Sequence, residues 1–329
     1  MTQPLSMLVL YKKLSKLGLS ENYVRQSGLP SWWDDELNNK PAAVLEGAGH
    51  IAKRLHLDLR SLLTEDQDVK FKHLPHTKFK RNNQQESSIP TTSHQIASRV
   101  AELVAYGVQR PFLPIPENAN QIRIEILQSH SEITLESILN YCWQHGIAVV
   151  YFNDYPEDTR KLTGMIQGHC DRPTIVLSSA RKYPAQLAFD LAHELGHLAL
   201  GHIIDGILID DEINQKSDDA EETAANTFAV KLLVDNLDNC FQSKNFHNNN
   251  QLINAIAERL KSNSTVDPCV LAFNYAWHTQ SYGLANTAVK ILSPAEDGHK
   301  IINQFLEAHL DWDHLGDDNS DHLDRILGD

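Results

Sequence analysis

The feature that most constrains this chain is a set of polar side chains inside an otherwise apolar segment, LAFDLAHELGHLALGHII, at residues 187–204. The segment predicts a mostly buried helix from Pro184 to Ile204, with Pro184 in its first turn and Gly206 ending it in the left-handed conformation. Buried histidine and glutamate side chains are costly unless they have partners. A bound metal ion would satisfy several of them at once.

The spacing of these residues predicts a hydrolytic zinc site. His193 and His197 are four residues apart, so a helix presents both imidazoles to one point. Zinc favours such nitrogen ligands at about 2.0–2.1 Å. Glu194 lies one position round the helix, where it could take the proton from an attacking water without binding the metal. We therefore predict one Zn²⁺ per chain, with Glu194 as the general base.

A third ligand is expected from the next helix, predicted over residues 218–235. Glu221 and Glu222 are the two candidates. Asp218 and Glu221 have the spacing of an N-terminal capping pair, which would give Glu221 a structural role. Glu222 begins a stripe along the apolar face, and Asn226, one turn later, could hydrogen-bond a metal-bound imidazole. These spacings favour Glu222 as the ligand, with Glu221 as the alternative.

Two further side chains near the motif have less defined roles. His202 follows His197 by five residues, so on a continuous helix it points away from the ligands and is expected to be structural. Cys170 precedes the helix, and its thiolate could occupy a fourth zinc position and silence the site. The alternative for Cys170, which we prefer, is an inert buried thiol.

The rest of the chain predicts an α+β fold that is mostly helical, with a small β-sheet packed against the zinc-binding helices. We expect four parts: a helical N-terminal module (1–66), a linker (67–93), a metallopeptidase core (94–240) and a helical C-terminal region with an acidic tail (241–329). Strands are predicted at Ile147–Phe152, Leu162–Ile166 and Thr174–Ser178. The other helices are predicted at Met7–Leu17, Pro41–Leu55, Leu59–Leu63, Ile96–Val108, Leu135–His145, 249–262, 266–280 and 294–309.

Composition excludes several classes of protein. Hydrophobic residues make up 41% of the 329-residue chain and charged residues 22%, as in ordinary globular proteins. No apolar run is long enough to span a membrane, and the N-terminus lacks a secretory signal. The four cysteines lie far apart, which predicts reduced thiols and a cytoplasmic location. The net charge of −14 is unevenly distributed, with +4 in the first hundred residues and −18 in the other 229, so the core is a poor candidate for binding nucleic acid.

At the two motifs the chain resembles the ImmA/IrrE family of zinc metallopeptidases. Members combine His-Glu-Leu-Gly-His with a downstream helix of the form Glu-x-x-Ala-Asn/Asp-x-Phe-Ala, here His193–His197 and Glu222–Ala229. The strand RPTIVLSSA and the approach LAFDLA are also similar, and the resemblance covers about residues 95–235. It implies a thermolysin-like core in which His193, His197 and Glu222 bind zinc and Glu194 is the general base.

The resemblance also implies a protein substrate. Family members typically cleave helix-turn-helix repressors in stress responses, mobile elements or toxin–antitoxin-like modules. We expect the substrate to pair as an added strand with an edge formed by Thr174, Ile175, Val176, Leu177 and Ser178. The stretch PAAVLEGAGHIAKRLHLDLRSLL faintly resembles the closing helices of a helix-turn-helix domain, so nucleic-acid binding by the N-terminal module stays open. The alternative function is a transcriptional or interaction regulator with a non-catalytic zinc site.

Overall fold

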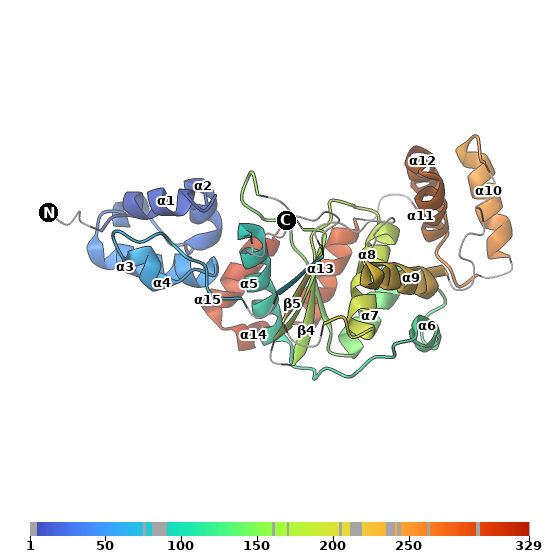
Figure 1. Ribbon diagram of the computed structural model, residues 1–329, viewed down its shortest axis with the longest axis horizontal. Coiled ribbons are helices and arrows are strands. Elements are labelled where there is room, and N and C mark those ends of the chain that lie inside the picture. The colour runs from blue at the N-terminus through green and yellow to red at the C-terminus, as the bar shows by residue number, and fades with distance from the viewer. Residues whose placement is uncertain are drawn as a thin grey trace.

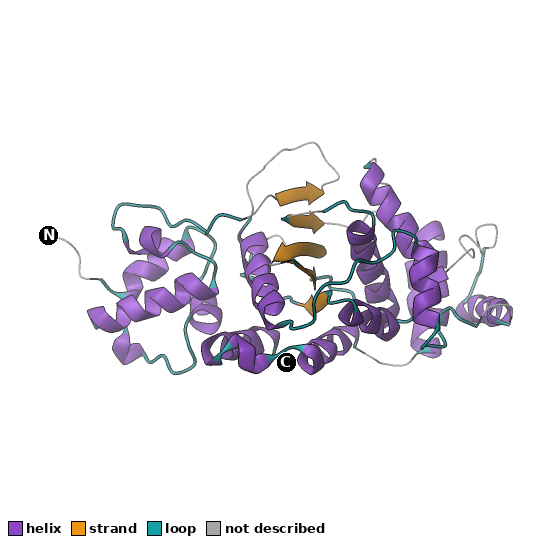
Figure 2. Cartoon of the chain, turned by 90° about the horizontal axis from the view of Figure 1, so that it is seen from below, coloured by secondary structure: helices purple, strands orange, loops and turns teal. Residues whose placement is uncertain are grey.

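A five-stranded mixed sheet lies at the centre of the molecule, with helices on both of its faces (Figures 1 and 2). The strand order is β1 (Thr77–Lys80), β5 (Ile207–Asp210), β3 (Gly164–His169), β4 (Arg172–Leu177) and β2 (Ala148–Tyr151). β3 runs antiparallel to both of its neighbours, whereas β2 with β4 and β1 with β5 are parallel pairs. The predicted α+β class is confirmed.

The computed structural model describes residues 5–74, 91–159, 162–169, 171–203, 206–210, 219–234, 241, 245–261, 264–293 and 297–328, together with the backbone of residues 77–80. Within these ranges, none of the helices combines the length and the apolar character that crossing a membrane requires.

The two faces of the sheet belong to two different hydrophobic clusters, because successive side chains of a strand point to opposite faces. Val149, Ile166 and Ile175 pack in the same cluster as α7 (Leu135–Gln144) and α8 (Pro184–Ala199). Val150 and Val176 pack on the other face, in the same cluster as α5 (Thr92–Gly107). The sheet therefore separates the motif helix α8 from α5.

Most predicted elements are present with ends shifted by a few residues. The N-terminal module contains α1 (Met7–Ser15), α2 (Glu21–Tyr23), a π-turn (Val24–Gly28), a 3₁₀ turn (Asp35–Leu37), α3 (Pro41–Arg54) and α4 (Leu59–Leu63). The remaining helices are α6 (Ala119–Leu127), α9 (Ala220–Val234), α10 (Asn249–Leu260), α11 (Pro268–Thr279), α12 (Tyr282–Leu292), α13 (Gly298–His309), α14 (Trp312–Leu315) and α15 (Asp317–Leu327). The sequence analysis did not predict α2, α6, α12, α14, α15, β1 or β5.

The motif helix is shorter than predicted. α8 ends at Ala199, and Gly201 adopts a φ of 68°, the left-handed conformation that favours glycine after a helix. The predicted end at Ile204 is therefore wrong, although Ile204 itself lies outside the described residues. After Gly201 the chain turns back, and the backbone N–H of His202 donates to the carbonyl of His197 at 3.0 Å.

The predicted substrate edge is also wrong. Thr174–Leu177 lies in β4, which pairs with β2 on one side and with β3 on the other, so its backbone donors and acceptors are already used. The edges of the sheet are β1 and β2. Asn303 of α13 covers β2 by donating to the carbonyl of Tyr151 and accepting from its backbone N–H, at 3.1 and 2.9 Å.

The predicted linker is only partly a linker. Val69 and Leu74 are buried in the cluster that contains the N-terminal module. The backbone N–H of Lys72 donates to the carbonyl of His56 at 2.8 Å, which ties this stretch to the end of α3. Residues 77–80 then form β1 beside β5, so two of the segments we assigned to a solvated tether are ordered parts of the fold.

The C-terminal region divides into two groups of helices. α11 packs against α8 and α9, and α10 and α12 pack against α11, whereas α13 to α15 return to the sheet and the N-terminal module (Figure 1). In α15, the Asp318 carboxylate accepts from Lys53 and Arg54 of α3, each at 2.7 Å. Arg325 donates to the carbonyl of Leu29 at 2.7 Å. The end of the chain thus closes against its beginning.

His322 makes this closure sensitive to acid. Its side chain is buried in α15, and burial together with the nearby Arg54 and Arg99 lowers its pKa to about 3. In the unfolded chain this imidazole has a pKa of about 6.5. Between about pH 6.5 and pH 3 the unfolded chain therefore binds a proton at His322, whereas the folded state keeps the imidazole neutral. Its contribution to the free energy of unfolding is complete above about pH 6.5 and is lost as the pH falls towards 3, at about 1.4 kcal/mol per pH unit.

We predict that His322→Gln lowers the slope of the free energy of unfolding against pH, between pH 6.5 and 5, by up to about 1.4 kcal/mol per pH unit. This slope corresponds to the uptake of one proton on unfolding, and glutamine cannot take up that proton. Chemical denaturation at several pH values measures this slope. His73→Gln, at an exposed position, is the control. Equal slopes for wild type and His322→Gln would contradict the assignment.

Candidate metal centre

The helix pair α8 and α9 brings three predicted ligands together. His193 and His197 are fully buried, and their Nε2 atoms lie 3.1 Å apart. Glu222, in the first turn of α9, directs its carboxylate between them. Its Oε2 lies 3.5 Å from Nε2 of His193, and its Oε1 lies 3.3 Å from Nε2 of His197.

Asp210 is a fourth residue with a ligand atom at this site, and the sequence analysis did not predict it. It is the last residue of β5, it is 1% exposed, and its Oδ2 lies 3.5 and 3.6 Å from the Nε2 atoms of His193 and His197. One ligand atom from each of the four residues lies within 4.8 Å of the other three. We call this set, His193, His197, Asp210 and Glu222, the ligand cage.

The cage has the dimensions of a tetrahedral metal site. Ligands at about 2.0–2.1 Å from a tetrahedral ion lie about 3.3 Å from one another. The nitrogen–nitrogen and nitrogen–oxygen separations here run from 3.1 Å to 3.6 Å. Both carboxylate oxygens of Asp210, and Oε1 of Glu222, are buried without a hydrogen-bond donor. Two imidazoles and two carboxylates that lack such donors fit a divalent cation.

Each imidazole also has a hydrogen-bond partner at Nδ1, the ring nitrogen that points away from the cage. Asn226 Oδ1 lies 3.1 Å from Nδ1 of His193, and Nδ1 of His202 lies 2.8 Å from Nδ1 of His197. An Nδ1–H that donates to these partners leaves Nε2 unprotonated and directed into the cage, which is the tautomer that a metal requires. The prediction that His202 points away is therefore wrong, because the helix ends before it and the chain turns back.

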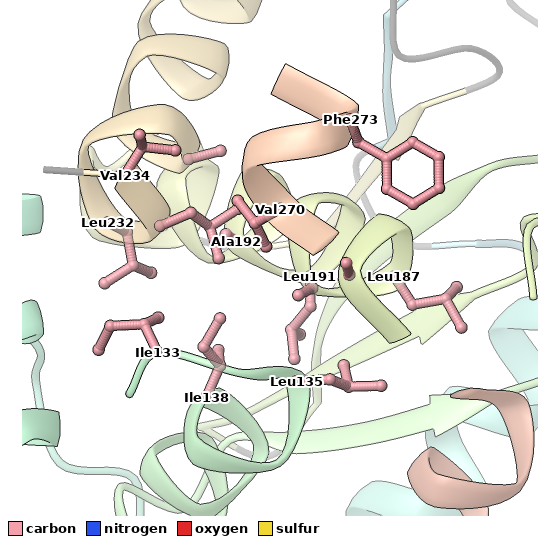
Figure 3. Packing of buried hydrophobic residues seen from close by; sticks show 14 of the residues in the cluster. Ile133, Leu135, Ile138, Leu187, Leu191, Ala192, Leu232, Val234, Val270 and Phe273 are labelled. Atoms are coloured by element: carbon pink, nitrogen blue, oxygen red, sulfur yellow. The ribbon is translucent and has the colours of Figure 1, made fainter. Parts of the chain in front are cut away.

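Packing between α8 and α9 sets the width of the cage. Leu187, Leu191 and Ala192 of α8 gather with Leu232 and other side chains in one apolar cluster (Figure 3). On the neighbouring turn, a Cβ at position 196 would lie 3.0 Å from Cδ1 of Phe228 in α9, so glycine in the motif permits the close approach of the two helices. The apolar contacts thus hold the two histidines opposite Glu222.

Glu194 lies beside the cage but outside it. Its carboxylate is fully buried, and neither oxygen has a hydrogen-bond partner. A Cβ on Gly164 of β3 would collide with Oε1 of Glu194, so only glycine leaves room for this carboxylate. Burial, reinforced by the negative charge of Asp210, raises the pKa of Glu194 well above its ordinary value. The site therefore holds a carboxylate with a high affinity for a proton and no structural partner.

The charges of the cage are mutually dependent. Burial disfavours a charge on His193, but the nearby carboxylates of Asp210 and Glu222 outweigh this effect and raise the pKa of His193 to about 10. Burial likewise opposes ionisation of Glu222, but the two imidazoles beside its carboxylate hold the pKa of Glu222 well below its ordinary value. Two carboxylates in one buried pocket require a cation, and a metal ion would replace the proton on the imidazole.

Other predicted residues lie elsewhere. Glu221 is outside the cage, and its backbone N–H donates to Oδ1 of Asp219 at 2.8 Å, which caps the start of α9. Asp218, the predicted cap, lies outside the described residues, and so does Cys170. The signal for Asp210 was weak, because a single carboxylate at the end of the apolar run ILID has no fixed spacing from the motif.

A small sheet backed by a helix with two histidines, and a second helix that adds a carboxylate, define a metallopeptidase-like centre. Residues 142–260 match the Peptidase_M78 family, described as the IrrE N-terminal-like domain. This match supports the resemblance to the ImmA/IrrE family that the two motifs indicated. No curated protein matches the chain. The matched domain runs from the end of α7 to the end of α10, so the N-terminal module, β1 and α11 to α15 lie outside it.

We predict that the wild-type protein binds about one zinc ion per chain and that Glu222→Ala loses most of it, because the substitution removes a ligand from the cage. Metal analysis after dialysis against a weak chelator measures the content. Glu221→Ala is the matched control, since its carboxylate is outside the cage. Loss of zinc from Glu221→Ala, with full retention by Glu222→Ala, would overturn the assignment.

Proposed function

We propose that this protein is a zinc-dependent endopeptidase. The observation that carries the proposal is the combination of a tetrahedral ligand cage with Glu194, a buried carboxylate that has neither a metal-ligand position nor a hydrogen-bond partner. Zinc, when bound by the cage, would supply the positive charge that polarises a scissile carbonyl and stabilises the negative charge that develops on it.

Glu194 has the properties of a general base. It is buried beside the cage, and both of its oxygens lack a hydrogen-bond donor, so its carboxylate is available to accept a proton. It takes a proton from the water that attacks the peptide carbonyl and donates it to the departing amine. The close packing of Gly164 against Glu194 fixes the carboxylate without using its oxygens, which leaves both available for this transfer.

The substrate that we propose is a helix-turn-helix repressor or antitoxin in a stress-response or mobile-element module in the cytoplasm. Two considerations support it: the ImmA/IrrE resemblance, and a net charge of −14, which is complementary to a basic DNA-binding protein. Charge complementarity favours encounter with such a partner more than it determines where the chain is cut.

A second candidate function is a regulator whose metal site is structural. One observation favours it: Asp210 adds a fourth protein ligand, and zinc sites with four protein ligands are usually structural, whereas catalytic sites keep one position open. The two candidates differ in what Glu194 does. A regulator has no use for a buried carboxylate without partners, whereas a peptidase requires one.

We predict that Glu194→Gln keeps its zinc but loses peptide hydrolysis by roughly 10²–10⁴-fold, because the amide has the same shape and cannot accept the proton. Zinc content and turnover of an unfolded test peptide, measured on the same preparation, separate the two effects. Hydrolysis at the wild-type rate would exclude Glu194 from the mechanism and favour the regulator.

We also predict that the zinc-loaded full-length protein cleaves a helix-turn-helix repressor encoded beside its own gene at one site or a few. Mass spectrometry of the products identifies the site, and Glu194→Gln is the control for a contaminating protease. If the repressor stays intact while an unfolded peptide is cut, the repressor proposal fails and the endopeptidase proposal stands.

A further inference from the structure

We infer that β5 is an internal strand that occupies the place of a substrate, and that Asp210 holds the site closed as the fourth metal ligand. The inference rests on the proposed endopeptidase function and adds its regulation. The form that the structure describes is then a latent form, and Asp210 must leave the metal before a peptide can be cut.

The position of β3 shows where an extended substrate has to bind. β3 is the strand that contacts the catalytic apparatus, because its Gly164 packs against the carboxylate of Glu194. A chain that extends the sheet main chain to main chain, and also reaches Glu194 and the cage, has to pair with β3 on the side away from β4. The other side of β3 is already paired with β4.

β5 already fills that position. It pairs with β3 in antiparallel register, with Leu208 opposite Ile166 and Asp210 opposite Gly164. The residue of β5 that reaches the metal ligands is thus paired with the residue of β3 that contacts Glu194. The position where a scissile peptide would meet both the metal and the base is taken by the carboxylate of Asp210.

The bare carboxylate of Asp210 indicates that a metal ion is part of this arrangement. Both of its oxygens are buried and receive no hydrogen bond, and an isolated ionised carboxylate in such surroundings is strongly destabilising. The Nε2 atoms of His193 and His197 are its nearest partners, at 3.5 and 3.6 Å. A cation in the cage would stabilise Asp210 there, and Asp210 would in turn hold β5 on β3.

The outer side of β5 is covered as well. β1 pairs with it in parallel register over its whole length, from Thr77 opposite Ile207 to Lys80 opposite Asp210. β1 belongs to the stretch that follows the N-terminal module, so the strand that closes the site is bordered by a segment outside the matched family domain. Removing β5 from β3 requires a change at β1, which gives the N-terminal part of the chain a means to control access.

The test uses the full chain loaded with Co²⁺ and titrated with acetohydroxamate, a small bidentate ligand for an open metal position. Visible absorption reports both the coordination of the ion and the binding of the hydroxamate. We expect Asp210→Ala to bind acetohydroxamate at least about tenfold more tightly than the wild type, because the substitution opens the fourth position. Glu221→Ala, which removes a nearby carboxylate outside the cage, should behave as the wild type.

Asp210→Asn, which is nearly isosteric, is the second variant in case Asp210→Ala fails to fold, and far-UV circular dichroism checks both. Its neutral amide is a weaker ligand, so it should also bind hydroxamate more tightly than the wild type. Equal hydroxamate binding by the wild type and the folded Asp210 variants would overturn the inference and leave the endopeptidase proposal intact. If the wild type bound no metal at all, the endopeptidase proposal would fail together with the inference.

Discussion

The structure depends on one electrostatic constraint: two carboxylates and two imidazoles share a pocket from which water is excluded. Asp210 and Glu222 repel each other there, and neither can be left charged without a cation between them. The apolar packing of α8 on α9 keeps Glu222 beside the two histidines, because moving its helix away would break up the cluster around Leu191 and Leu232. The cage therefore keeps two negative charges close together in a buried site, and a bound divalent cation would neutralise them.

The same constraint joins the sheet to the active helices. Asp210 is the end of a strand, whereas the other three members of the cage come from helices, so binding of an ion would fix the register of β5 on β3 as well as the spacing of α8 and α9. This explains how one cluster can have features of both a catalytic and a structural site. Glu194 with the three ligands from helices is the arrangement of a catalytic zinc site. Asp210, on a strand that we infer can leave β3, adds the fourth protein ligand that is typical of a structural zinc site.

Local periodicity determined how much of the site was predictable. His193, Glu194 and His197 follow from the geometry of a single helix, and Glu222 with Asn226 follows from one turn of another. His202 was misjudged because its position depends on where the helix ends, and Gly201 ends it one turn earlier than the apolar run suggests. Asp210, the role of β4 inside the sheet, and β1 within the expected linker depend on strand order, which is a non-local property that no spacing along the chain encodes.

The most direct test of this account is the anomalous diffraction of zinc-loaded crystals at the zinc absorption edge. We expect a single peak per chain about 2.0–2.1 Å from Nε2 of His193, Nε2 of His197, an oxygen of Glu222 and an oxygen of Asp210. A peak absent from the cage, or one bound by the two histidines and Glu222 with Asp210 turned away from it, would contradict the four-ligand site on which the account rests.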